Sequence, residues 1–368
     1  MGEGQVEWDE DVNVKRGYDL YGRSLEKRAG KARNFKFCDD QGQAADNFLM
    51  VYNSPAYPNG NDALCYDAEN WATDAVYKLK VGKTPAKDPK SKHSYIDEHI
   101  LELQTLKWFL HSYMNDKAGG LDEFKWKPKE FDTDPATKQK RSYCEYFHKY
   151  WDEPLGAKPK GKKKTTAFDF VATAFPSKTA HGDELVMLEN NTNAVKAQMF
   201  KLKQNDMVAK EDLDTYELAV QNLRGMERLV ERFKYVVLMM KYMNDPKVND
   251  IYKKQAIRIG DKLEEAEKLL VDKWKNAPEP YKKQDLKAAW MKFAKEHTDW
   301  MNSKVKRFYD RYKPKMEEAI ENYPKTAGRK DYKEKFDQQT RDERKQFYEE
   351  MKVMVKEVNN AKSFKNPF

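Results

Sequence analysis

Apolar residues recur at helical spacing through four long segments in the second half of the chain, and prolines separate these segments. The segments span residues 210–244, 247–276, 283–322 and 330–358. In the first segment the apolar positions follow nearly a heptad repeat, with one extra step of three residues between Leu223 and Met226. Short proline turns between long amphipathic helices favour antiparallel neighbours. The pattern therefore predicts a bundle of several long helices.

The composition agrees with an elongated helical molecule. Charged residues make up 35% of the chain and hydrophobic residues 39%, against about 25% and 45–50% in ordinary globular domains. The net charge of +8 comes from 69 basic and 61 acidic residues, which alternate along most segments. Such mixing is typical of solvated helix faces and of helix–helix partners. The net charge alone leaves nucleic acid and an anionic membrane surface open as partners and favours neither.

The chain divides into four parts by composition and period. We expect an N-terminal arm with short helices, a loop rich in lysine, proline and glycine, the bundle of long helices, and a C-terminal tail. These parts correspond to residues 1–151, 152–181, 182–358 and 359–368. The predicted fold class is all-α: an elongated bundle of long antiparallel amphipathic helices with a less regular, aromatic-rich helical N-terminal half.

Helices are also predicted outside the four long segments. Ser94 and Asp97 have the spacing of a capping box, which predicts a helix that begins there and ends before Gly119. Further predicted helices cover residues 44–52, 62–80, 135–150 and 183–204.

Cysteine usage and hydropathy restrict the environment of the chain. Cys38, Cys65 and Cys144 are odd in number and far apart, which favours a reducing compartment and argues against a zinc site. The longest apolar run, Tyr235–Met240, is far shorter than the ~20 residues that a membrane span needs. The acidic N-terminus does not resemble a transit or signal peptide. We therefore predict no transmembrane span and find no readable targeting signal.

Motifs for catalysis and for cofactor binding are missing from the sequence. The glycine–lysine run of residues 156–163 has Lys163 where a phosphate-binding loop needs Ser or Thr. We therefore interpret Lys158–Lys164 as a solvated lysine loop. The histidines include no His-Glu-x-x-His pair, and His297 lies within an apolar stripe, where packing explains it best. The sequence predicts a protein that is not an enzyme, with no cofactor, no metal and no small-molecule substrate.

Aromatic residues at helical spacing supply the candidate interaction site. Nucleic-acid readers combine such rings with basic residues, but rings at this spacing more often belong to a core or a protein interface. The candidate protein-interface residues are Trp290, Phe293, Trp300, Phe308, Tyr312, Tyr332 and Phe336. The final Asn366-Pro367-Phe368 matches a tripeptide that some endocytic adaptors recognise, although a frayed tail is the expectation.

Three runs within residues 286–336 carry a family resemblance. They are LKAAWMKFAKEH from Leu286, VKRFYDRYKPKMEEAIENYP from Val305 and DYKEKF from Asp331. The runs resemble the start of subunit d of mitochondrial ATP synthase, which has a tryptophan helix, an amphipathic helix, a proline turn and a tyrosine-lysine helix start. The matching positions are Trp290, Phe293, Ala294, Phe308, Pro324, Tyr332 and Lys333. The acidic-tryptophan pair that the family often carries is replaced here by Lys330-Asp331.

The resemblance implies a non-catalytic subunit of the peripheral stalk, which holds the catalytic head against rotor torque. It also implies contacts with subunit b and with the upper-stalk subunit, on the matrix side of the mitochondrial inner membrane. Two alternatives share the bulk features. One is a cytoskeletal or flagellar helical scaffold. The other is a basic nucleic-acid-binding protein of the high-mobility-group kind, to which Trp274-Lys275 and Pro280-Tyr281 are faintly similar.

Overall fold

Helices dominate the computed structural model. It describes residues 33–36, 47–50, 64–66, 79–81, 95–110, 143–156, 165–176, 180–202, 207, 223–326, 341–361 and 363–368. Its helices are α1 (Gln104–Trp108), α2 (Tyr143–Trp151), α3 (Ala167–Ala172), α4 (Asn190–Phe200), α6 (Leu223–Asn244), α7 (Pro246–Trp274), α8 (Leu286–Thr326) and α10 (Arg341–Asn360). The predicted all-α class is confirmed.

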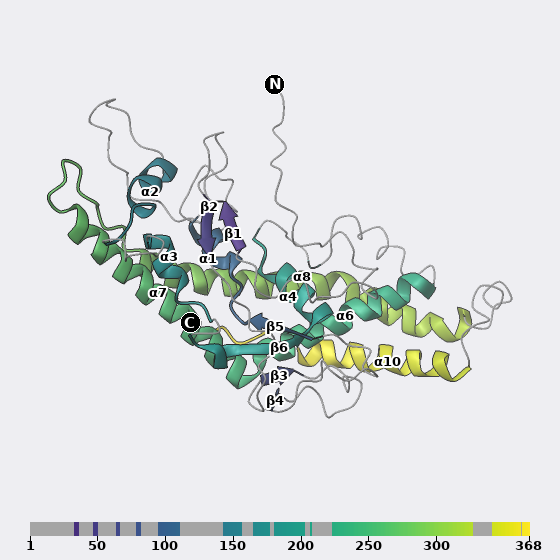
Figure 1. Ribbon diagram of the computed structural model, residues 1–368. Coiled ribbons are helices and arrows are strands. Elements are labelled where there is room, and N and C mark those ends of the chain that lie inside the picture. Colours follow the sequence, from purple (N-terminus) through teal and green to yellow (C-terminus); the bar gives the residue numbers. More distant parts are fainter. Residues whose placement is uncertain are drawn as a thin grey trace, which may run out of the picture.

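Helix α8 is the spine of the molecule. It has 41 residues, or about 60 Å at 1.5 Å per residue. Helix α7 packs along its first half, and α6 and α10 pack against its second half (Figure 1). The Trp290 indole donates to the carbonyl of Ala256 at 2.7 Å. Closer to the start of α7 and further along α8, the Tyr252 hydroxyl lies 3.2 Å from that of Thr298. The order of these contacts shows that α7 and α8 form an antiparallel hairpin.

The start of α7 follows from its local sequence. The Asp245 carboxylate accepts hydrogen bonds from the amides of Lys247 and Val248 at 2.9 and 3.3 Å. Pro246 occupies the first helical turn, where its missing N–H costs nothing. The predicted stripe from Val248 to Leu270 is buried. The predicted helix of residues 247–276 is confirmed to within two residues.

Close packing of the hairpin depends on one glycine. A Cβ atom at Gly260 would lie 3.3 Å from Cδ1 of Trp290 and 3.4 Å from Cγ of Lys287. The first distance is tighter than most Cβ contacts, so a larger residue here would require the Trp290 ring to shift by a few tenths of an ångström.

The prolines of α8 do not interrupt it. A proline inside a helix removes one backbone hydrogen bond, so Pro314 is expected from the sequence to kink this helix or to restart it. The helix instead continues through Pro314 and Pro324 to Thr326. No new helix begins at Pro314, so the expected restart is wrong.

Two small sheets were not predicted from the sequence. One pairs β1 (Arg33–Lys36) with β2 (Asn47–Met50), and the other has the order β4-β3-β6-β5. The strands of the second sheet are β3 (Leu64–Tyr66), β4 (Leu79–Val81), β5 (Tyr95–His99) and β6 (Leu185–Glu189). The helices predicted for residues 44–52 and 62–80 are therefore wrong at these strands.

The helix predicted to begin at Ser94 is also wrong in its first part. Residues 95–99 form β5, which pairs antiparallel with β6, and α1 is the α-helix among the residues described between His99 and Leu110. The helix predicted for residues 183–204 is also wrong in its first part, because a short 3-10 helix (Gly182–Glu184) and β6 precede α4. Short apolar runs fit a strand and a helix equally well. The pairing of two segments far apart in the chain decides between them.

Residues 152–181 are not a loop throughout. Helix α3 lies among them, and Thr166 and Asp169 form a capping box at its start. Buried side chains of α2 and α3, such as Phe147 and Phe168, join the same core as the α7–α8 hairpin. The Lys158–Lys164 run lies outside the described residues. The four-part domain division stays a prediction.

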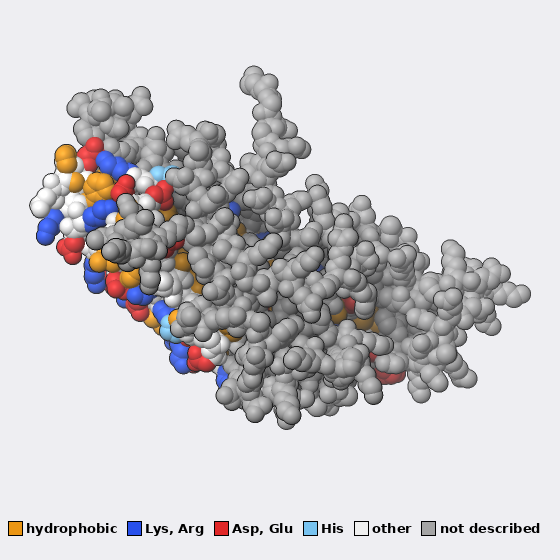
Figure 2. All heavy atoms as spheres, viewed as in Figure 1, with side chains coloured by type: hydrophobic (Ala, Val, Ile, Leu, Met, Phe, Trp, Pro, Cys, Tyr) orange, Lys and Arg blue, Asp and Glu red, His pale blue; other side chains and the backbone are white. Residues whose placement is uncertain are grey.

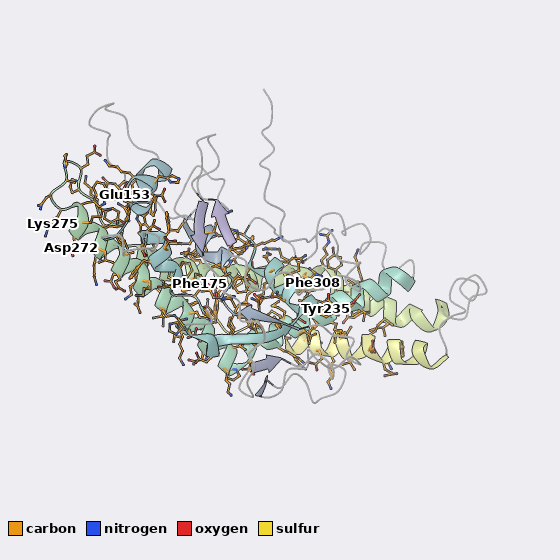
Figure 3. The ribbon with its side chains drawn as sticks, viewed as in Figure 1. Glu153, Phe175, Tyr235, Asp272, Lys275 and Phe308 are labelled. Carbon is orange, nitrogen blue, oxygen red and sulfur yellow. The ribbon has the colours of Figure 1, made fainter. Side chains whose placement is uncertain are left out.

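Figure 3 shows Tyr235 and Phe308 among the side chains where α6 meets α8. The ring of Phe233 lies 4.8 Å from that of Phe308 and stacks on that of Tyr309 at 5.9 Å. Val237, on the same helix, is 2% exposed. This contact joins α6 to the spine.

We predict that Val237→Asp lowers the free energy of unfolding by at least about 3 kcal/mol, because it buries a charge with no partner. Urea unfolding monitored by circular dichroism measures the loss. Lys253→Asp introduces the same residue on the exposed face of α7 and is the control. Equal stability of Val237→Asp and wild type would contradict the packing of α6.

Candidate functional site: buried polar centres among the helices

Five of the seven predicted interface aromatics lie inside the chain's own core. Trp290, Phe293, Phe308 and Tyr312 have no exposed surface, and Trp300 is 5% exposed. The predicted stripe is therefore real, but its described members contact this chain. As folded here, these five rings are not available to a partner. Tyr332 and Phe336 lie outside the described residues.

These aromatics contact rings from other helices. The ring of Phe109 lies 5.3 Å from that of Trp290 and 5.5 Å from that of Phe293. Phe293 in turn stacks on His297 at 5.3 Å. The aromatic face of α8 thus packs against the C-terminal end of α1.

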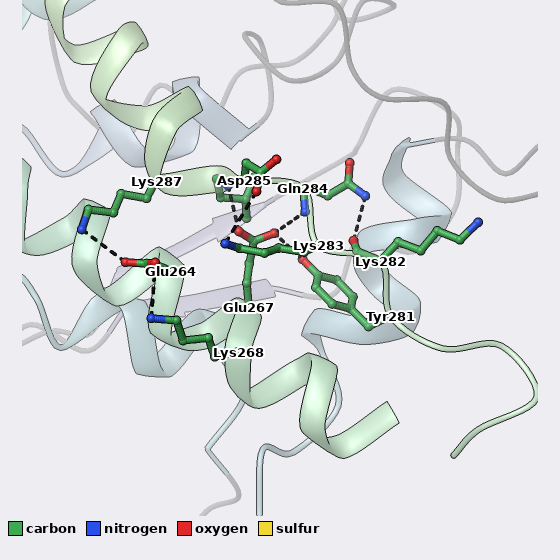
Figure 4. A network of polar contacts seen from close by, with 10 residues as sticks. Glu264, Glu267, Lys268, Tyr281, Lys282, Lys283, Gln284, Asp285 and Lys287 are labelled. Atoms are coloured by element: carbon green, nitrogen blue, oxygen red, sulfur yellow. Dashed lines mark hydrogen bonds and ion pairs between the residues drawn. The ribbon is translucent and has the colours of Figure 1, made fainter. Parts of the chain in front are cut away.

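Glu267 is a buried carboxylate at the turn between α7 and α8 (Figure 4). One of its oxygens accepts from the backbone amide of Gln284 at 2.5 Å and from the Tyr281 hydroxyl at 3.1 Å. The other oxygen accepts from the amide of Leu286, the first residue of α8, at 2.8 Å. Burial raises the pKa of Glu267, and the three donors oppose this shift. Because N–H groups at a helix start lack intrahelical partners, Glu267 acts as a cap supplied by the preceding helix.

Aromatic side chains of α2 contact the same turn. The Trp151 indole donates to the Tyr281 hydroxyl at 3.4 Å. The Tyr146 hydroxyl donates to the Lys282 carbonyl at 2.7 Å and accepts from the Lys282 amide at 3.1 Å. Side chains of helix α2 therefore hydrogen-bond to the α7–α8 turn and stabilise its conformation.

Lys196 of α4 is the second polar centre, and its side chain is fully buried. Its ammonium lies 3.0 Å from a carboxylate oxygen of Glu98 and 2.9 Å from one of Glu102. It also donates to the His99 carbonyl at 2.6 Å. Burial alone would lower the pKa of Lys196, but the two carboxylates outweigh this effect and raise it. The triad ties α4 to the β5–α1 segment.

Lys304 and His297 of α8 form the third centre, at the C-terminus of α4. The buried Lys304 ammonium donates to the carbonyls of Gln198, Met199 and Lys201 at 2.7, 3.2 and 2.8 Å. These carbonyls lie at the negative end of the α4 dipole, where a cation is stabilising. His297 donates through Nε2 to the Phe200 carbonyl at 2.7 Å. Burial, with a contribution from Lys304, lowers the pKa of His297 to about 3.

Arg258 of α7 makes the fourth centre with Glu184. Its two terminal nitrogens donate to the two carboxylate oxygens at 2.6 and 2.5 Å. Its Nε donates to the Ala174 carbonyl at 2.7 Å. Together these contacts link Ala174 and Glu184, which lie on the two sides of residues 177–179, to α7.

The four centres share one arrangement. Each charge contacts backbone groups or an opposite charge of the same chain, and each contact joins two or more elements. Among the described residues, no group of three or more His, Cys, Asp or Glu side chains is arranged to hold a metal ion. Whether the chain has catalytic activity stays a prediction from the sequence.

The sequence interpretation missed these centres because charged residues are usually exposed. A signal was present at two of them. Glu267 lies four residues after Leu263 and three before Leu270, so it shares the face of the α7 stripe. Lys304 lies four residues from both Trp300 and Phe308 and shares the face of the α8 stripe in the same way. No sequence signal singled out Lys196, whose partners lie about one hundred residues away.

Comparisons with known proteins returned no relative. No family model matches the chain, and neither a curated protein nor a solved structure is significantly similar to it. Within the described ranges, no helix combines the length and the apolarity that crossing a bilayer requires.

We predict that Glu267→Gln lowers the free energy of unfolding by about 1–3 kcal/mol, because the amide can accept on only one atom and leaves a buried N–H unpaired. Urea unfolding at neutral pH measures the change. Glu264→Gln is the matched control one turn earlier, where the carboxylate contacts only Lys268 and Lys287. A larger loss for the control would contradict the capping role.

A second prediction concerns acid. Since the pKa of His297 is about 3 in the folded chain and its usual value is 6.5, the unfolded chain binds the proton more tightly. Stability is therefore lost as the pH falls below 6.5. Between pH 6.5 and 5 this loss is about 2 kcal/mol.

The variant His297→Gln keeps an N–H donor for the Phe200 carbonyl but does not titrate. Its free energy of unfolding is expected to fall less than that of the wild type over the same pH interval. Parallel pH profiles of the two proteins would show that His297 does not cause the loss.

Proposed function

We propose that this chain is a non-catalytic structural subunit of a large assembly. The observation that carries the proposal is the use of its buried charges: Glu267, Lys196, Lys304 and Arg258 each join one helix to another element. Such cross-links favour a rigid body with a 41-residue spine, α8, over a site that binds a small molecule. A rigid, long-helix body suits a strut.

In its most specific form the proposal is a peripheral-stalk component similar to subunit d of mitochondrial ATP synthase. The support is the sequence resemblance over residues 286–336, whose first part coincides with α8. The proposed partners are subunit b and the upper-stalk subunit. The proposed location is the matrix side of the mitochondrial inner membrane.

The exposed face of α7 is compatible with helical partners. In Figure 2 basic and acidic side chains alternate along this edge of the molecule. Pairs within the helix, such as Lys254 with Asp250 and Lys268 with Glu264, neutralise much of this charge. A face of this kind does not favour a polyanion, because counterion release needs an excess of basic residues.

The nucleic-acid alternative loses support at its own residues. Tyr281 is 4% exposed and its hydroxyl donates to Glu267. The Trp274 ring packs edge-on against that of Tyr150 at 5.0 Å. Both rings pack within the chain near the α7–α8 turn. A cytoskeletal or flagellar scaffold shares the helical features and is distinguished by location.

The test is affinity purification of the tagged full-length chain from its own cells, followed by mass spectrometry. The proposal predicts ATP synthase subunits among the enriched proteins and a mitochondrial location by fluorescence. Recovery of cytoskeletal proteins, or of no ATP synthase subunit, would reject the stalk assignment. Recovery of the chain as a monomer without partners would reject the scaffold role altogether.

A further inference from the structure

The C-terminal residues 363–368 lie in an extended course over the junction of α6, α7 and α8. We expected a frayed tail here, and the structure corrects this expectation. Phe364 is 2% exposed, whereas Ser363 and Lys365 beside it are exposed. A single side chain is therefore fully inserted, and the backbone lies close to the surface.

Three asparagines from different helices hold this backbone. Asn302 of α8 accepts from the Phe364 amide at 2.9 Å and donates to the Phe364 carbonyl at 3.0 Å. Asn244, at the end of α6, accepts from the Lys365 amide at 3.0 Å and donates to the Ser363 carbonyl at 3.0 Å. Asn249 of α7 donates to the Lys365 carbonyl at 2.9 Å. We name these three residues the asparagine clasp.

The clasp offers a peptide backbone the same kinds of hydrogen-bonding groups as the edge of a sheet. A neighbouring strand would offer alternating N–H and C=O groups to an extended peptide, and the side-chain amides of Asn244 and Asn302 offer the same pairs. Backbone recognition of this kind supplies affinity, and selectivity comes from pockets for particular side chains. The pocket here takes the Phe364 ring.

The last three residues add a second anchor. The Asn366 amide donates to the Asp299 carboxylate at 2.7 Å and to the Lys295 carbonyl at 3.2 Å. Its side-chain oxygen accepts from the Phe368 amide at 3.0 Å, which closes a turn. The Phe368 ring then packs edge-on against Tyr252 of α7 at 5.6 Å. The Asn-Pro-Phe tripeptide is thus engaged within the chain.

We propose that the clasp is a docking site for extended peptides, and that residues 363–368 occupy it as a strap that detaches while the helices stay folded. Phe364 is the one buried side chain of residues 363–368. Five of the seven hydrogen bonds that join these residues to the helices are exposed to solvent, and the two to Asn302 are partly buried. Segments with few buried apolar contacts open at low free-energy cost. Its matching ligand is an extended peptide with phenylalanines four residues apart, as in Phe364 and Phe368. This inference does not depend on the proposed assembly.

Native-state hydrogen exchange of the full-length chain tests detachment. Amides of Phe364 and Lys365 are expected to be protected at least about a hundredfold less than those in the middle of α7. Equal protection of the strap and of α7 would overturn the proposal, because the strap would then open only with the whole fold. This measurement needs no variant.

Binding of a labelled peptide with the sequence of residues 361–368 tests the docking site. In a full-length chain carrying Phe364→Ser and Phe368→Ser, the vacated clasp is expected to bind the peptide at least about tenfold more tightly than wild type. Adding Asn302→Ala is expected to abolish binding, whereas adding Asn360→Ala, which alters an exposed asparagine at the end of α10, is not.

Failure of the folded double variant to bind the peptide would overturn the docking site, as would binding that persists with Asn302→Ala. If the double variant does not fold, the hydrogen-exchange comparison on wild type decides. Both outcomes leave the scaffold proposal unaffected, since that proposal is decided by co-purification.

Discussion

The rest of the fold depends on the carboxylate of Glu267 at the α7–α8 turn. By accepting from the Leu286 and Gln284 amides, it sets where α8 begins and how it leaves the turn. The other described helices gather on this hairpin: α3 packs on α7, α6 packs on both helices, and α4 and α10 pack on α8. Helix α2 contacts the turn itself through the Tyr146 hydroxyl. A change in the direction of α8 would therefore move the elements of both halves of the chain.

The remaining buried charges also pair with backbone groups or carboxylates of other elements, and so join those elements. Lys304 satisfies the end of α4, and Lys196 holds the other side of α4 to the β5–α1 segment. Burying a charge without a partner costs several kcal/mol, so each of these contacts is also a constraint on alternative packings. Helices that slide past one another would leave ions unpaired, so these contacts resist sliding, as the proposed structural role requires.

The sequence predicted the parts of the fold that local chemistry decides. The bounds of α7 follow from Asp245 and Pro246 at its start and from its unbroken stripe. The strands β5 and β6 could not be predicted, because their pairing joins residues 95–99 to residues 185–189. For the site, the aromatic stripe of α8 was predicted, but its burial by α1 and α6 depends on tertiary contacts. The asparagine clasp was not predicted, because three separate helices contribute to it.

The central claim is that the buried charges serve the fold and not a reaction, and the Lys196 triad tests it most directly. Lys196→Met alone is expected to cost about 3–5 kcal/mol of unfolding free energy, since it leaves two carboxylates unpaired. Adding Glu98→Gln and Glu102→Gln should restore most of that stability. The account predicts that the triple variant, expressed in place of the wild-type chain, supports normal growth and enters the same complexes. A triple variant that is as stable as wild type but fails to replace it would contradict the account.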